Sequence, residues 1–229
     1  MTINTTFAAG LVVLAGTVTT VSAQLGDFTR AELNTAFIPG TGNSNTNFAI
    51  NRSEEASGNI IEVGSKAKER FFGESTGGGT GARYIVQDGF SPTSGAGGAP
   101  LSSDAWWNYD FSVDLGSRLT DSVAIVFTVS NLAADPDVLT GPLPLTTETG
   151  LPAGISLFQG SQNIGFAPLD LLTNWDAFDH VDYLFELAVF DKVSSAPLGA
   201  TNMTVRVIPT PASAAILGLG GLAAVRRRR

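Results

Sequence analysis

The chain contains a single histidine, His180, and a search for catalytic chemistry begins there. A Ser-His-Asp triad would have to use this residue, and Asp176, Asp179 and Asp182 lie close to it in sequence. We expect no Gly-x-Ser-x-Gly elbow, the turn that presents a catalytic serine between a strand and a helix. A zinc site would need carboxylates for every other ligand, because the chain has no cysteine. We therefore predict that His180 is a loop residue just before a strand.

Pairs of carboxylates could instead hydrolyse glycosides. The candidates are Glu54, Glu55, Asp110 and Asp114, and the two aspartates alternate with aromatic residues. Such alternation is typical of a strand with one buried face and one exposed face. We interpret Asp110 and Asp114 as part of a solvated strand face and predict that the protein is not an enzyme.

Calcium is the only cofactor that the sequence leads us to consider. The best candidates are Asp135-Pro-Asp137 and the acidic cluster between Asp170 and Asp182. Neither matches the Asp-x-Asp-x-Asp-Gly spacing of a calcium-binding loop, so we predict no metal site. Trp106 is the one aromatic residue that we expect on the outside of a strand, where its ring could stack on a sugar.

The end of the chain combines three features in a fixed order. Pro209-Thr210-Pro211 is followed by an uncharged segment, Ala212 to Val225, and the chain ends with Arg226, Arg227, Arg228 and Arg229. A helix over the uncharged segment would be roughly 20 Å long, against about 30 Å for the apolar core of a bilayer. The arginines can reach the far headgroups and keep the C-terminus in the cytoplasm. The pattern predicts a short membrane helix, and an ordinary stop-transfer anchor is the alternative.

This arrangement resembles the PEP-CTERM sorting signal of bacteria that carry an exosortase. The family most often has Pro-Glu-Pro, and Thr210 stands here in place of the glutamate. The resemblance implies that residues 209–229 insert transiently in the inner membrane, where an exosortase, a membrane-embedded protease, recognises Pro-x-Pro and cleaves near it. It also implies a final location at the cell surface or in an extracellular matrix, with exopolysaccharide as a partner. It covers about a tenth of the chain.

The beginning of the chain points to export as well. Residues 1–23 contain the apolar run Phe7 to Gly16 and end in Val21-Ser22-Ala23, so a signal peptidase is expected to cut between Ala23 and Gln24. No Lys or Arg precedes the apolar run, which is unusual for a signal peptide. A buried N-terminal helix or strand is the alternative. The predicted exported domain is then residues 24–208.

The charge balance excludes one class of partner. The chain has 21 acidic and 13 basic residues, and four of the basic residues are the terminal arginines. The predicted exported domain therefore carries nine basic and 21 acidic side chains, a net charge of −12. Binding to nucleic acid requires clustered basic residues, so nucleic acid is not an expected partner.

The middle of the chain has the alternation and the turn residues of a β protein. Ile61, Val63 and Ala67 share one parity while Glu62, Lys66 and Lys68 share the other, which predicts a half-buried strand over Ile60 to Phe72, with a helix as the alternative. The other predicted strands are Asn47 to Arg52, Arg83 to Gln87, Trp107 to Leu115, Ser122 to Ser130, Tyr183 to Asp191 and Thr201 to Ile208, with a hairpin of Ile155 to Gln159 and Asn163 to Phe166 around Gly160.

Three further segments complete the predicted domain. Residues 73–81 are read as a glycine loop, residues 131–154 as a long linker, and Leu169 to Asp179 as one short helical turn. Many short strands with glycine-rich turns predict an all-β antiparallel sandwich of jelly-roll or immunoglobulin-like type. The functional hypothesis is a non-enzymatic exported surface or matrix protein. A carbohydrate-binding module that uses Trp106 is the second hypothesis and a secreted hydrolase the third.

Overall fold

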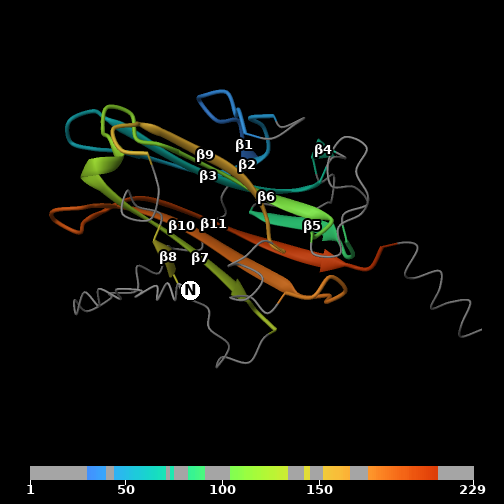
Figure 1. Cartoon of the computed structure of the whole chain (residues 1–229). Coiled ribbons are helices and arrows are strands. Elements are labelled where there is room, and N and C mark those ends of the chain that lie inside the picture. The colour runs from blue at the N-terminus through green and yellow to red at the C-terminus, as the bar shows by residue number, and fades with distance from the viewer. Residues whose placement is uncertain are drawn as a thin grey trace, which may run out of the picture.

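The structure is a computed structural model that describes residues 30–39, 44–70, 73–74, 82–90, 104–133, 142–144, 152–165 and 175–210. Within these ranges the chain is all-β, and its regular elements are strands and one 3-10 turn, η1 (Thr120–Ser122) (Figure 1). The strands are β1 (Arg30–Ala31), β2 (Phe48–Glu54), β3 (Ile60–Glu69), β4 (Gly73–Glu74), β5 (Arg83–Gln87), β6 (Trp107–Asp114), β7 (Val123–Asn131), β8 (Pro142–Pro144), β9 (Leu157–Asn163), β10 (Asp182–Asp191) and β11 (Pro197–Ile208).

The strands form two sheets that lie one above the other (Figure 1). Sheet A has the order β1-β2-β3-β6-β9, with β4 paired to the end of β3, and sheet B has the order β5-β11-β10-β7-β8. All pairs are antiparallel except β5 and β11, which run parallel. The prediction of an all-β fold is confirmed, although this parallel pair departs from a purely antiparallel sheet.

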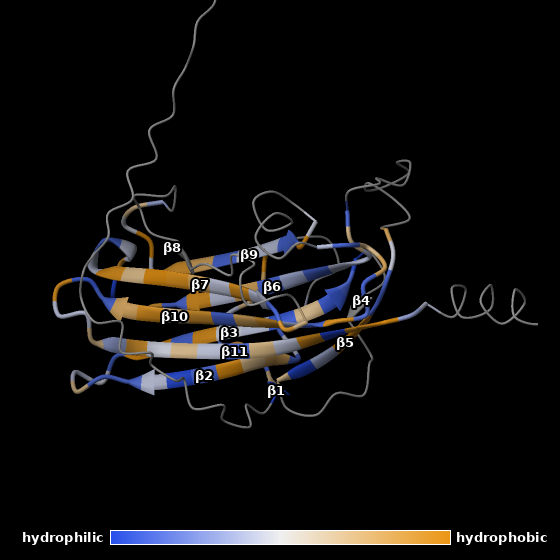
Figure 2. Ribbon diagram, turned by 90° about the horizontal axis from the view of Figure 1, so that it is seen from below, coloured by the Kyte–Doolittle hydropathy of each residue, from blue (hydrophilic) through white to orange (hydrophobic). Residues whose placement is uncertain are grey.

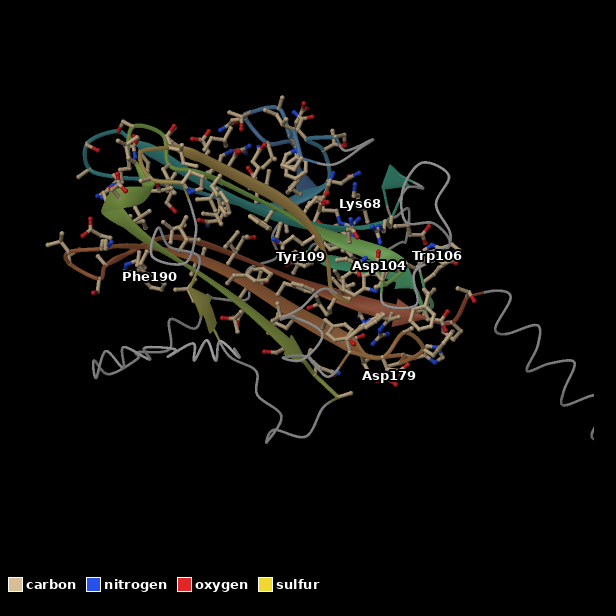
Figure 3. The ribbon with its side chains drawn as sticks, viewed as in Figure 1. Lys68, Asp104, Trp106, Tyr109, Asp179 and Phe190 are labelled. Atoms are coloured by element: carbon tan, nitrogen blue, oxygen red, sulfur yellow. The ribbon has the colours of Figure 1, made fainter. Side chains whose placement is uncertain are left out.

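The core lies between the two sheets and is rich in aromatic rings. On β6, Trp107, Tyr109 and Phe111 are at most 3% exposed and point at sheet B. The ring centroid of Tyr109 lies 5.2 Å from that of Phe127 on β7 and 5.1 Å from that of Phe185 on β10. Figure 3 shows Tyr109 between the layers, and Figure 2 shows the apolar residues concentrated along the strands. The predicted aromatic face of Trp107 to Leu115 is confirmed.

The outer face of sheet A is also buried around β3 and β6, and for Asp110 the sequence-based interpretation was wrong. Lys66 and Asp110 are paired residues of β3 and β6, and they are 1% and 0% exposed. We define the buried polar layer as the polar side chains on this face that are at most 5% exposed: Glu62, Lys66, Lys68, Asp110 and Ser112. Asp110, Glu62, Lys66 and Lys68 are therefore not a solvated strand face.

Residues 32–39 and 44–47, here called the N-terminal cover, lie over the buried polar layer. The backbone N–H of Asn34 donates to Glu62 Oε1 at 3.0 Å, and Glu62 Oε2 accepts from Arg52 Nε at 2.6 Å. The cover adds a small apolar cluster of its own, in which Leu33 and Phe37 pack on Phe48 of β2. These contacts remove the carboxylate of Glu62 from water and supply its hydrogen-bond donors.

Lys66 is the more completely enclosed of the two lysines in the buried polar layer. Its Nζ atom donates to the carbonyl oxygens of Ser44 at 2.7 Å and Thr46 at 3.3 Å. The same atom lies 4.0 Å from Asp110 Oδ2 and 4.6 Å from the ring centroid of Phe48. The ammonium group is thus stabilised by carbonyl dipoles, a carboxylate and an aromatic face at once.

β9 corrects the predicted hairpin around Gly160. The strand continues from Leu157 to Asn163 without a turn and pairs along its whole length with β6. A Cβ atom on Gly160 would lie 2.3 Å from Cζ of Phe111, the residue with which Gly160 pairs. The glycine is required because the Phe111 ring packs over its backbone, and not because the chain reverses there.

Three smaller predictions were also imprecise. The segment predicted as a linker, residues 131–154, contains the short strand β8, which pairs with β7. The predicted glycine loop begins with β4, which pairs with β3. Leu169 to Asp179 was predicted to contain a short helical turn. The structure describes residues 175–179 of this segment, and they are not helical. The strand over Ile60 to Phe72 is confirmed as far as Glu69, and the alternative helix is wrong.

At one end of the two sheets, Arg118 joins three segments of the chain. Its guanidinium group donates to Glu55 Oε1 at 2.7 Å and to Asp191 Oδ2 at 2.8 Å. The hydrogen bond from Arg118 lowers the pKa of Glu55. The backbone N–H and hydroxyl of Ser194, followed by Arg118, lower the pKa of Asp191 well below its ordinary range. Arg118 therefore connects the end of β2 to the end of β10 through two ionised carboxylates.

Replacing Arg118 by glutamine is expected to lower the midpoint of thermal unfolding by a few degrees at neutral pH and to weaken its dependence on pH. Carboxyl groups with lowered pKa values stabilise the fold above their unfolded pKa values, here 4.5 and 3.8, and lose that contribution as the pH falls through the folded values. Circular dichroism melting curves between about pH 6 and about pH 2 would measure the effect. Asp121→Asn, on an exposed residue of η1, is the control. The prediction would be contradicted if the unfolding midpoint of Arg118→Gln depended on pH as strongly as that of the wild type.

The predicted membrane segments cannot be compared with the fold, because residues 1–23 and 212–225 lie outside the described residues. Among the residues that the structure describes, no helix has the length and apolar character needed to cross a bilayer.

Candidate functional site

Pro209 and Thr210 follow directly after β11, the last strand that the structure describes. This strand runs parallel to β5, with Ile208 beside Gln87, and both strands end together. The next residue after β5, Asp88, donates its backbone N–H to the carbonyl oxygen of Ile208 at 2.9 Å. Because parallel strands end at the same edge, the two residues that follow β11 emerge beside Asp88.

The side chain of Asp88 binds the middle residue of Pro209-Thr210-Pro211. Its Oδ1 atom accepts the backbone N–H of Thr210 at 2.7 Å, and the residue is 2% exposed. Proline has no backbone N–H, so Thr210 carries the one main-chain donor of the tripeptide. The buried carboxylate thus holds the motif at the only point where its backbone can donate.

His180 is the second partner of Asp88. Its Nε2 atom lies 2.9 Å from Asp88 Oδ2, and its side chain is 44% exposed. The three acids near it in sequence have other roles or positions: Asp176 accepts the backbone N–H of Phe178, Asp182 binds Arg206, and Asp179 lies in the exposed turn. His180 is therefore a loop residue, as predicted, that adds a second contact to the carboxylate that binds Thr210.

An aromatic surface lies next to this site. Phe90 packs edge to face against Phe178, with ring centroids 5.6 Å apart, and against Trp175 at 6.1 Å. Phe178 is 57% exposed. Trp106 donates its backbone N–H to the carbonyl oxygen of Gly89, and the residue, which we expected on the outside of a strand, is half-buried. Figure 3 shows Trp106 and Asp104 at the end of the fold toward which β11 runs.

The carboxylates that could have formed a glycosidase pair do not share a site. Asp110 lies in the buried polar layer with Lys66, and Glu55 binds Arg118 at the far end of β2. Asp114 accepts the backbone N–H of Gly116 in the turn after β6. Glu54 is the last residue of β2 and is exposed. Asp110, Glu55 and Asp114 therefore each have a structural partner within the fold.

No group of three or more His, Asp or Glu residues in the described ranges is arranged to hold a metal ion. Asp135, Asp137 and Asp170, which belong to the two candidate calcium clusters, lie outside those ranges. The same is true of Ala23, Gln24, Pro211 and the four terminal arginines, so the structure describes only Pro209 and Thr210 of the predicted sorting motif.

Sequence reasoning missed two features, a Gly-x-Ser-x-Gly pentapeptide and the role of Asp88. The pentapeptide Gly73 to Gly77 fits Gly-x-Ser-x-Gly, but its first two residues form β4, and Ser75 lies outside the described residues. Asp88 was interpreted as the start of a loop. An isolated Asp-Gly pair after a strand gives no sign that the carboxylate will meet a segment 122 residues later in the chain.

No protein-family model matches the chain, and comparisons with curated proteins and with solved structures give no match.

Proposed function

We propose that this chain is a non-enzymatic exported protein of the cell surface or extracellular matrix, with residues 209–229 as a sorting signal for an exosortase-type protease. In this proposal residues 1–23 are a signal peptide, and residues 24–208 form a β-sandwich of jelly-roll or immunoglobulin-like type that persists outside the cell. The C-terminal helix would insert only transiently in the inner membrane, and exopolysaccharide is the proposed partner of the exported domain.

One observation supports the proposal more than any other. The last described strand, β11, ends at Ile208, and the motif begins at the next residue, Pro209. A processing signal must lie outside the domain that it delivers, because a protease needs an extended segment that is not part of a sheet. The boundary expected from sequence and the end of β11 coincide at the same residue.

The test is to express the full chain in a bacterial host that carries an exosortase and in a matched strain that lacks it. Mass spectrometry of the protein from the first strain is expected to show an N-terminus at Gln24 and loss of the residues beyond Pro211. The double variant Pro209→Ala/Pro211→Ala is expected to keep the arginines, whereas Pro197→Ala, on an exposed proline at the start of β11, is expected to be processed normally. A wild-type protein that retains Arg226 to Arg229 in the first strain would refute the sorting proposal.

A second candidate function is carbohydrate binding, and the aromatic surface around Phe90 is the observation that favours it. Phe178 and the partly exposed Trp106 and Trp175 could stack on sugar rings, next to polar groups of His180 and Asp176. Screening the purified protein on a glycan array, with and without calcium, tests this function. Binding that disappears in Phe178→Ala would support it, and a blank array would remove it.

A further inference from the structure

β9 is the edge strand of sheet A, and its outer side has no partner among the described residues. It pairs with β6 on one side only, from Leu157 opposite Asp114 to Asn163 opposite Asn108. Figure 2 shows β9 and β2 on opposite sides of the fold. In an edge strand, every second residue points its backbone N–H and carbonyl groups outward. Every second residue of this seven-residue strand therefore presents an unused donor and acceptor.

The other edges in the described part of the chain carry the usual protection against pairing. β8 begins and ends with proline, which cannot donate to a ladder. The carbonyl of Arg83 on β5 accepts a hydrogen bond from the side chain of Arg30. β2 carries Arg52 and Glu54 where it extends past the two residues of β1. Natural sheets use prolines and charges of this kind to prevent edge association.

β9 has none of these devices. Its sequence, Leu-Phe-Gln-Gly-Ser-Gln-Asn, contains no charge and no proline, in a chain whose net charge is −8. Two copies of so acidic a protein repel each other over most of their surface, and they can approach most easily where both surfaces are neutral.

We propose that β9 is an interface between two copies of this chain, in which the strand pairs antiparallel with itself across a two-fold axis. In this register Gly160 meets its own symmetry copy, Gln159 meets Ser161, and Phe158 meets Gln162, so no like charges face each other across the axis. A strand that pairs with itself makes the same contacts from both sides, which closes the assembly as a dimer. Sheet A then continues through both copies, and no new side-chain packing is needed to begin the contact.

The first test compares two lysine variants of the full chain, purified in detergent so that both apolar ends are retained. Ser161→Lys places two like charges diagonally across the axis and is expected to weaken dimerisation about tenfold or more. Ser130→Lys, on the outer face of β7, changes the net charge by the same amount and is expected to leave dimerisation unchanged. Sedimentation velocity over a range of concentrations measures the dissociation constant, and circular dichroism checks the fold.

The second test uses the absence of cysteine in the chain. Equal amounts of the single variants Gln159→Cys and Ser161→Cys are mixed and oxidised. The proposed register places these two positions opposite each other, so a mixed disulfide dimer is expected in high yield. The pair Thr128→Cys and Ser130→Cys on β7 is the control. The proposal is overturned by a monomeric wild-type chain at every concentration, by equal dissociation constants for the two lysine variants, or by equal disulfide yields in the two mixtures.

Discussion

Lys66→Met is expected to lower the free energy of unfolding by about 3–5 kcal/mol, because it removes one partner of a buried ion pair and leaves the other in place. Methionine has nearly the same length and can occupy the same space between Phe48 and the cover. It cannot donate to the carbonyl oxygens of Ser44 and Thr46, and it leaves the carboxylate of Asp110, which is 0% exposed, without its ammonium group. Urea unfolding followed by circular dichroism measures the change.

Two further variants make this prediction specific. Lys192→Met, in the exposed turn after β10, is expected to change the free energy of unfolding by less than about 0.5 kcal/mol. The double variant Lys66→Met/Asp110→Leu removes both charges and is expected to recover much of the lost stability, because an apolar pair needs no desolvation of charge. A single variant as stable as the wild type would show that Lys66 does not compensate Asp110.

Asp88→Ala is expected to release the segment that begins at Pro209. A hydrogen bond to a charged acceptor contributes about 1.5–3 kcal/mol, so its loss should speed amide exchange at Thr210 by about 10–100-fold. Asp88→Asn keeps an oxygen that can accept the Thr210 N–H and should give an intermediate value. Hydrogen exchange read by mass spectrometry on peptides that span Thr210 measures the effect.

The matched control for this prediction is Asp121→Ala, on an exposed aspartate of η1. It should leave the exchange rate of Thr210 unchanged. In the proposed function the released motif is the substrate of the sorting protease, so Asp88→Ala should also be processed faster in cells. Exchange at Thr210 that is equally fast in the wild type and in Asp88→Ala would mean that Asp88 does not hold the motif.

A glutamate at position 210, the residue most common in the family that the tail resembles, would bring a second carboxylate close to Asp88. Like charges at such a distance repel, and Asp88 is almost fully buried, so water would screen the repulsion poorly. Threonine avoids this conflict. If the tail is the sorting signal proposed above, this repulsion gives a physical reason for threonine in place of glutamate at position 210.

Local alternation was sufficient to predict the strands that form the core. Trp107, Tyr109 and Phe111 were assigned correctly to the interior, and the last strand was predicted to end at Ile208, where it does end. In these segments one face is apolar and the other polar, so the periodicity of two is visible in the sequence.

The errors came from contacts between residues far apart in the chain. Alternation predicted that Lys66 and Asp110 face water, since nothing in β3 or β6 reveals that the N-terminal cover folds over them. Gly160 was interpreted as a turn, because a glycine chosen for close packing of Phe111 has the same appearance in a sequence. The partnership of Asp88 with Thr210 has no local signature at all. A sequence pattern reports which face of a strand is apolar, but not what later covers the polar one.

The order of strands in sheet B determines when the protein can finish folding. Among the described strands β11 is the last to be synthesised, yet it lies inside the sheet, between β10 and β5. Until residues 197–208 have left the ribosome or a secretion channel, β5 has no neighbour and Asp88 has no Thr210 to bind. A nascent chain therefore stays incomplete while its tail is still inside the machinery that makes or moves it, and insertion of the final strand both closes the sheet and captures the tail.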